Sequence, residues 1–146
     1  MEIIRVTASE VGQVAQLFDQ YRVFYRQPSD PELARAFIGE RVARSESVIF
    51  LAQRQGQSVG FTQLYPSFSS VSARRTWILN DLFVVPSCRG QGVGTLLLEA
   101  ARTHTLETGA KGIGLETAVD NFTAQRLYES NGYSREEGFY SYFLTL

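Results

Sequence analysis

Hydrophobic positions in the first part of the chain alternate as in a strand and then recur at helical spacing. Residues 1–6 predict a first strand, and Thr7 and Glu10 have the spacing of a capping box, in which each satisfies a free amide at a helix start. A helix with one apolar face is then predicted by Val11, Val14, Ala15, Phe18, Tyr21 and Tyr25. Asp30-Pro31 predicts the start of a second helix.

From Ser47 onward the pattern becomes that of strands. VIFLAQ and SVGFTQLY predict a hairpin that turns at 54–57, and a loop over 66–73 leads to a long strand over 75–85. A helix over 93–108, a short strand over 112–117, a helix over 122–130 and two final strands around 137–138 follow. This order predicts one mixed α/β domain over 1–146, with roughly six to seven strands flanked by helices.

Charge and cysteine content narrow the partners and the compartment. A net charge of −1 provides no basic field, so we expect neither nucleic acid nor a membrane surface as a partner. One cysteine cannot form an internal disulfide, which favours a reducing compartment. The N-terminus lacks the apolar core of a signal peptide, and no apolar run approaches the length of a membrane span, so we expect a cytoplasmic protein.

The stretch DLFVVPSCRGQGVG, residues 81–94, joins the long strand to a helix through a glycine-rich bend. A helix N-terminus carries free amide groups and the positive end of the helix dipole, so it binds phosphate readily. A Walker loop would need a Lys, which is absent, and a dinucleotide fingerprint would need Gly where Thr95 stands. Taken alone, the glycines are consistent with a phosphate cradle or with a bare turn.

Two separated motifs favour the cradle. Arg89-x-x-Gly92-x-Gly94 resembles the acetyl-coenzyme A pyrophosphate loop of the GNAT superfamily of N-acetyltransferases, whose pattern is Q/R-x-x-G-x-G/A. The segment from Asn121 to Tyr133 is similar to the family's N-x-x-A-x-x-L-Y-x-x-x-G-F/Y segment. The specific resemblance covers about residues 77–133. Within the family, the chain resembles the spermidine/spermine-type and histone-acetyltransferase-like members.

The resemblance implies a GNAT fold with acetyl-coenzyme A as co-substrate. The pantetheine arm would pair with backbone groups of Leu82, Phe83 and Val84, and Asn121 would hydrogen-bond to it. The pyrophosphate would lie on the bend and the first turn of the following helix, formed by Arg89, Gly90, Gln91, Gly92, Val93, Gly94 and Thr95. No metal is expected, and the single histidine argues against a zinc site.

The resemblance also assigns Tyr128 as the general acid, in contact with the cofactor sulfur. A thiol has a reference pKa near 8.5 and a Tyr one near 10, so a Tyr within reach can protonate the departing thiolate. An alkylammonium with a pKa near 10.4 is only about one part in two thousand neutral at pH 7, so a base is needed. Asp81, on the long strand, and Glu116, on the next, are the candidates.

Two further features bear on the base and the acceptor. Strand alternation predicts that Asn80 and Asp81 face opposite sides of the sheet, and many amine-acetylating relatives have an acidic pair where this chain has Asn80-Asp81. Tyr21 and Tyr25 fall where the family builds its acceptor pocket, and aromatic faces suit cationic amines. Together with Asp81 they form the predicted substrate-binding set.

These features predict a transfer of acetyl to a primary amine of a small molecule, such as a polyamine or an amino-acid derivative, by direct attack. A protein lysine or N-terminus is the alternative acceptor, and a non-catalytic acyl-coenzyme A sensor is the alternative outside enzymes. Alternating aromatics over 139–144 predict a final strand. Because such strands often pair across dimers in this family, a homodimer is expected.

Overall fold

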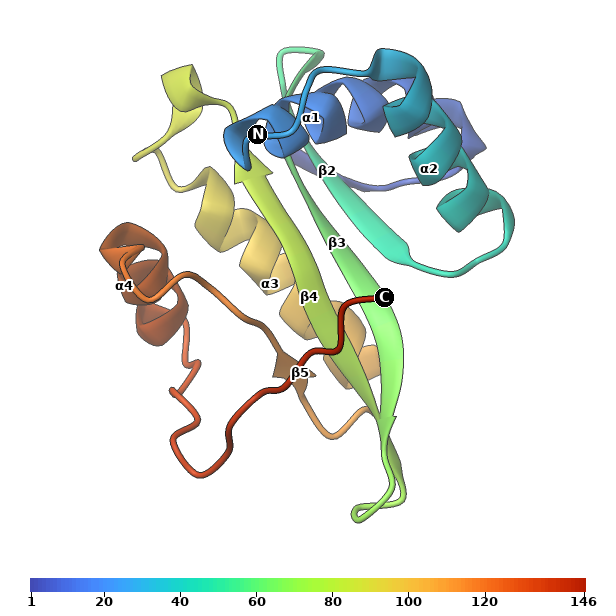
Figure 1. The fold of residues 1–146 in the computed structure, drawn as a ribbon. Coiled ribbons are helices and arrows are strands. Elements are labelled where there is room, and N and C mark those ends of the chain that lie inside the picture. The colour runs from blue at the N-terminus through green and yellow to red at the C-terminus, as the bar shows by residue number, and fades with distance from the viewer. The chain divides into compact units, whose positions relative to one another are not determined.

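A five-stranded mixed sheet is the framework of the computed structural model, which describes residues 1–146 in two compact units, 1–116 and 117–146. The sheet lies in the first unit with the order β1-β2-β3-β4-β5 (Figure 1). Its first four strands pair antiparallel, and β4 pairs parallel with β5. The strands are β1 (Glu2–Arg5), β2 (Val48–Arg54), β3 (Gln57–Ser69), β4 (Arg74–Val84) and β5 (Ile113–Gly114).

Three α-helices belong to the first unit and one to the second. They are α1 (Val11–Phe24), α2 (Pro31–Ala43) and α3 (Val93–Glu107), and then α4 (Phe122–Ser130). The predicted capping box of Thr7 and Glu10 is confirmed, although it opens a short 3-10 turn, Ala8–Glu10, that leads into α1. Asp30 caps α2 by accepting a hydrogen bond from the Leu33 amide. No helix is long and apolar enough to cross a bilayer.

The sheet has an apolar layer on each face. In one layer α1 and α2 pack on the sheet, and in the other α3 packs on the opposite face (Figure 1). Burial of these side chains is the main stabilising term, at about 25 cal/mol per Å² of apolar surface. The α1 face includes Val14, Leu17, Phe18, Ile38, Leu51, Phe61 and Phe83, and the α3 face includes Ala52, Val59, Val93 and Leu97.

A β-bulge in β4 changes which side chains face α1. The register runs from Gln63 opposite Asp81 directly to Leu64 opposite Leu79, so Asn80 is the extra residue. Trp77 contacts His104 of α3 and Phe83 contacts Tyr21 of α1, although their even spacing would put them on one face of a regular strand. The bulge therefore turns Asp81 and Phe83 toward α1.

The sheet has fewer strands than the sequence predicts. The two final strands around 137–138 are absent, and no backbone hydrogen bond involves a residue after Tyr133. Alternating aromatics favour a strand only where a neighbouring strand is available to pair with them, and here the segment has none. The strand predicted over 112–117 is confined to Ile113–Gly114, and β3 extends into the predicted loop as far as Ser69.

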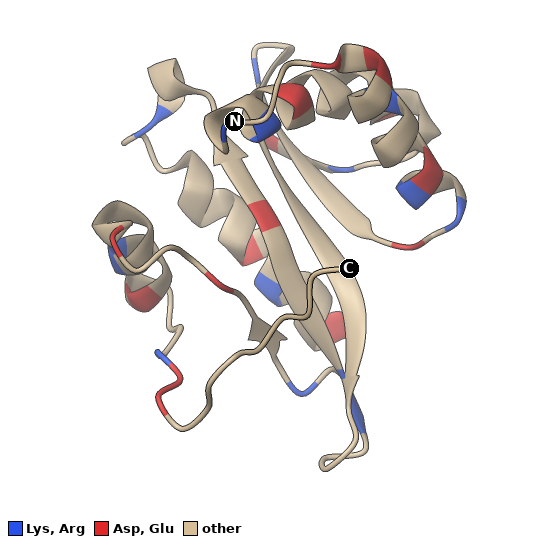
Figure 2. Cartoon of the chain, viewed as in Figure 1, with Lys and Arg blue, Asp and Glu red and all other residues tan.

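The second unit contains α4 and the C-terminal segment. Asn121 caps α4, its Oδ1 accepting from the Ala124 amide at 3.1 Å. At the other end Asn131 Nδ2 donates to the Leu127 carbonyl at 2.8 Å, and the Tyr133 amide donates to the Tyr128 carbonyl at 3.1 Å. These bonds fix the chain on both sides of Tyr128. Lys, Arg, Asp and Glu are interspersed along both units (Figure 2).

Candidate active site

The glycine-rich bend carries a run of free backbone donors. Gly90 and Gly92 have φ of 73° and 84°, a left-handed conformation that glycine adopts without strain. Gly92 is the N-cap of α3, and no side chain caps this helix end. The amides from Gly90 to Thr95 donate to no acceptor of the protein, and the first bond of the helix runs from the Leu96 amide to the Gly92 carbonyl. This geometry fits an anionic phosphate group.

A side chain from the β2–β3 hairpin braces the bend. Arg54 Nη1 donates to Gln91 Oε1 at 2.6 Å, and Gln91 Nε2 donates to the Ser87 carbonyl at 3.2 Å. The Gln91 side chain is therefore engaged within the protein, and only its backbone amide remains free. Arg54 lies in the predicted hairpin turn, where a lone cation gives no signal of contact with a bend far along the chain.

One edge of β4 is open beside the bend. β4 pairs with β5 only through Trp77 and Ile78, whereas on its other side it pairs with β3 as far as Val84. From Leu79 to Val84 the β4 backbone consequently has no strand partner on the β5 side. Leu82, Phe83 and Val84, the predicted pantetheine track, lie in this unpaired part.

Arg89 folds over the end of β4 rather than toward the free amides. Its Nε donates to the Val84 carbonyl at 2.8 Å, and its guanidinium lies 5.5 Å from the ring centre of Phe24 and 5.6 Å from that of Phe83. Arg89, Phe24 and Phe83 line a cleft of about 410 Å³ between α1 and β4. Arg89 thus engages one of the backbone groups that the family resemblance assigns to the cofactor.

Asp81 is the one buried carboxylate on the α1 face. It is 2% exposed, Oδ2 accepts from Gln63 Nε2 at 2.5 Å, and Oδ1 accepts from Asn80 Nδ2 at 2.8 Å. Burial raises the pKa of Asp81, while the hydrogen bonds from Asn80, Gln63 and Tyr21 oppose that rise. The expectation that Asn80 and Asp81 point to opposite sides was wrong, because the bulge at Asn80 brings the two side chains into contact.

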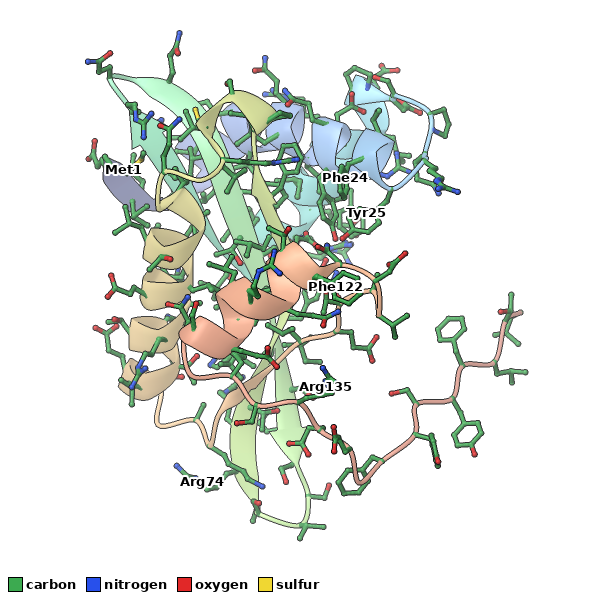
Figure 3. The ribbon with its side chains drawn as sticks, turned by 90° about the vertical axis from the view of Figure 1, so that its left-hand side faces the viewer. Met1, Phe24, Tyr25, Arg74, Phe122 and Arg135 are labelled. Carbon is green, nitrogen blue, oxygen red and sulfur yellow. The ribbon has the colours of Figure 1, made fainter.

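Aromatic side chains lie next to this carboxylate. The Tyr21 hydroxyl donates to the Asn80 carbonyl at 3.4 Å, and the Tyr21 ring meets that of Tyr25 edge-on at 5.0 Å between centres. Tyr25 is 54% exposed, at the end of α1 beside Phe24 (Figure 3). Burial, together with the Asp81 carboxylate, raises the pKa of Tyr65 to about 12. The predicted substrate-binding residues therefore contact one another in series: Tyr21 hydrogen-bonds to Asp81, and its ring contacts that of Tyr25.

The remaining candidates lie apart from the Asp81 cluster in the chain. The sequence predicted that Glu116 lies in a strand, but Glu116 is exposed and follows the end of β5. In the second unit Tyr128 is half-buried, with its ring 5.9 Å from that of Tyr133 between centres. Asn121 uses Oδ1 for the helix cap, and its Nδ2 donates to no protein acceptor.

Gln63 is a member of the cluster that the sequence did not indicate. It is fully buried on β3 between Thr62 and Leu64, and it bonds both Asp81 and Ser47. A polar residue at a buried position of a strand is the only signal that marks it, and such a residue needs a hydrogen-bond partner. The identity of that partner depends on strand register, which the sequence leaves open.

Comparison with known proteins decides the family. The sequence profile of the Acetyltransferase (GNAT) family matches residues 14–133, which include both the glycine bend and α4. The chain belongs to the GNAT family. It is therefore an N-acetyltransferase, an acyltransferase that uses acetyl-coenzyme A.

Relatives and solved structures agree with this assignment. The GNAT chain is 49% identical over 146 residues to the uncharacterized N-acetyltransferase YhfO of Bacillus subtilis (strain 168), covering 100% of this chain and 98% of that protein. The crystal structure of a probable acetyltransferase superposes with a TM-score of 0.95 at 42% identity, covering 100% of this chain and 98% of the other. The fold is also shared with aminoglycoside N-acetyltransferase AAC(6')-Iy in complex with CoA, with a TM-score of 0.82 at 19% identity and coverage of 99% and 95%.

Proposed function

We propose that the protein transfers the acetyl group of acetyl-coenzyme A to a primary amine of a small molecule, such as a polyamine or an amino-acid derivative. The observation that carries the proposal is the buried carboxylate of Asp81 beside the Tyr21 ring, on the face of β4 that meets α1. A buried carboxylate attracts an ammonium strongly, and tyrosine rings add cation–π attraction. Because Asp81 is buried, the amine of a slender aliphatic molecule reaches it more readily than an amine on the surface of a protein does.

The residues present fit the cofactor. The free amides from Gly90 to Thr95 would hold the pyrophosphate, and the open β4 edge at Leu82 to Val84 would pair with the pantetheine arm. Asn121 Nδ2 would donate to the same arm. When bound, the cofactor supplies the activated thioester carbonyl. Arg89 would release the Val84 carbonyl on binding, which frees its guanidinium for a phosphate oxygen.

Proton transfers by this chain's residues would complete the reaction. Asp81 would accept the first proton of the acceptor ammonium, directly or through one water, and the neutral amine nitrogen could then bond to the acetyl carbon. As the carbon–sulfur bond breaks, Tyr128 would donate its phenolic proton to the departing sulfur, and the Tyr128 phenolate, directly or through water, would take the second proton that the nitrogen must lose. Since Asp81 and Tyr128 belong to different compact units, we propose that residues 1–146 act as a single catalytic domain.

Thiol release from acetyl-coenzyme A over a panel of amines tests the proposed function. We expect release to be stimulated by small aliphatic diamines and amino-acid amides, and acetylated product to appear in equal amount by mass spectrometry. A peptide with a lysine and a free N-terminus serves as the protein-acceptor comparison. If only the peptide stimulates release, the acceptor is a protein and not a small molecule. If the protein binds the cofactor but no amine stimulates release, it is a sensor and not an enzyme.

We predict that Asp81→Asn lowers kcat/KM at pH 7 by about 10²-fold or more, because the amide cannot accept a proton. The wild-type rate needs the ionised carboxylate, and burial raises the pKa of Asp81, so kcat/KM should fall as the pH drops through that raised pKa. In Asp81→Asn this acid limb should disappear. A pH–rate profile measures both effects. Glu116→Gln is the matched control, and the opposite pattern between the two variants would make Glu116 the base.

We also propose a cytoplasmic homodimer, formed through the C-terminal segment 139–146. Six large hydrophobic side chains there are at least 81% exposed, an unfavourable arrangement for an isolated chain: Phe139, Tyr140, Tyr142, Phe143, Leu144 and Leu146. Sedimentation equilibrium should give twice the chain mass of 16.4 kDa, and deletion of 139–146 should give a monomer. A monomeric full-length protein would exclude this assembly.

A further inference from the structure

A chain of hydrogen bonds runs from the surface to the Asp81 carboxylate. Ser47, in the loop between α2 and β2, donates from Oγ to Gln63 Oε1 at 2.8 Å. Gln63 in turn donates from Nε2 to Asp81 Oδ2 at 2.5 Å. Gln63 is fully buried and Ser47 is half-buried, so Ser47 connects the network to the outer layer of the first unit.

The direction of these bonds sets what the carboxylate experiences. A primary amide has one acceptor end and one donor end, and reversing Gln63 would place its oxygen against the Asp81 carboxylate. That contact repels an ionised carboxylate and is relieved only when the carboxyl takes a proton. The ionised carboxylate accepts only, so it selects the orientation in which Nε2 faces Asp81, and the Ser47 hydroxyl then holds the other end of the amide by donating to Oε1.

We propose that Gln63 and Ser47 are positioning residues, which orient the Asp81 carboxylate and hold it in the ionised form that accepts the acceptor's proton. The inference rests on the proposed role of Asp81 as the base. Gln63 would act through Asp81 without touching acceptor or cofactor, and Ser47 would act through Gln63.

The other groups that face Asp81 differ from this pair in what they contact. On the α1 side Tyr21 contributes a hydrogen bond, and Asn80 holds only the second carboxylate oxygen, Oδ1. On β3 the pKa of Tyr65 is raised to about 12, so Tyr65 stays neutral across the pH range in which activity is measured. The Arg41 cation from the end of α2 acts on Tyr65 but is itself engaged by Glu40 and Glu46. Gln63 donates directly to Oδ2, so its replacement removes a hydrogen bond from the carboxylate itself.

The test is the pH dependence of kcat/KM in Gln63→Met and Ser47→Ala. Met keeps the length of Gln without a hydrogen bond, and Ser47→Ala leaves Gln63 in place and disturbs the core least. We expect the acid limb of Gln63→Met to move up by about one pH unit, the size of one lost hydrogen bond to a charged group. Ser47→Ala should move it in the same direction by less. Above the limb, both variants should recover to within a few-fold of wild type.

Controls separate positioning from general damage. Gln53→Met makes the same change on β2, where Gln53 bonds only Gln13, and it should leave the profile unmoved. In an Asp81→Asn background, Gln63→Met should cause no additional loss. An equal loss at every pH with an unmoved limb, or an undiminished loss in the Asp81→Asn background, would overturn the inference.

A readout independent of catalysis keeps this inference distinct from the proposed function. The carboxyl carbon of Asp81 can be titrated by NMR in the wild type, Gln63→Met and Ser47→Ala. An upward shift of its titration midpoint in the variants supports the positioning role even if Asp81→Asn retains full activity, which would refute only the base. An unchanged midpoint in Gln63→Met would overturn the positioning role whatever the activity shows.

Discussion

Tyr128→Phe should lower kcat by about 10²–10³-fold while leaving the affinity for acetyl-coenzyme A within about two-fold of wild type. The variant keeps the ring and loses only the hydroxyl, so packing against Tyr133 is retained. Without a proton donor the sulfur must leave as an unprotonated thiolate. This departure is slower than one in which a positioned phenol donates a proton to the sulfur. Rates of thiol release with a saturating amine, together with calorimetric cofactor affinity, measure the two effects.

Tyr133→Phe is the matched control for the acid. It removes a hydroxyl from the neighbouring aromatic ring of the same unit, and the Tyr133 amide keeps its bond to the Tyr128 carbonyl. We expect kcat to change by less than about three-fold in this variant, as for a group that takes no part in proton transfer. Equal losses in the two variants would indicate a structural role for both rings, and unchanged turnover in Tyr128→Phe would remove the acid assignment.

The helices and the glycine bend could be predicted because their signals are local. Thr7 and Glu10 form the expected capping box, Asp30 caps α2, and Asn121 caps α4. Each of these bonds joins residues within one helical turn, so sequence spacing alone determines them. For the same reason the positive φ at Gly90 and Gly92 follows from glycine at a tight bend between a strand and a helix.

The Asp81 environment could not be predicted, because it depends on pairing between distant strands. One extra residue at Asn80 changes the face of every side chain that follows it in β4, and alternation in the sequence does not mark a bulge. Gln63 reaches Asp81 only because that bulge sets the register of β3 against β4. The strand predicted over 139–144 is absent for a related reason, since a strand also requires a partner.

Gly92→Glu should weaken acetyl-coenzyme A binding by about a thousand-fold. At an effective dielectric constant of about 20, like charges about 4 Å apart repel by about 4 kcal/mol, which corresponds to that factor in Kd. A Cβ added at Gly92 would meet no protein atom within 4 Å, so the substitution causes no clash at that atom. The left-handed φ of 84° adds a strain of about 1 kcal/mol, which is a cost to folding and not to binding.

Two variants divide the effect on binding into its parts. Gly92→Ala carries the backbone strain without the charge, and it should weaken binding far less than Gly92→Glu. Gly109→Glu places the same side chain at another open glycine with a φ of 68°, just beyond the end of α3, and it should lower stability without changing Kd. Thermal unfolding and calorimetric titration separate the two quantities. Wild-type affinity in Gly92→Glu would locate the pyrophosphate away from this bend, because a carboxylate among its free amides must compete with a bound phosphate.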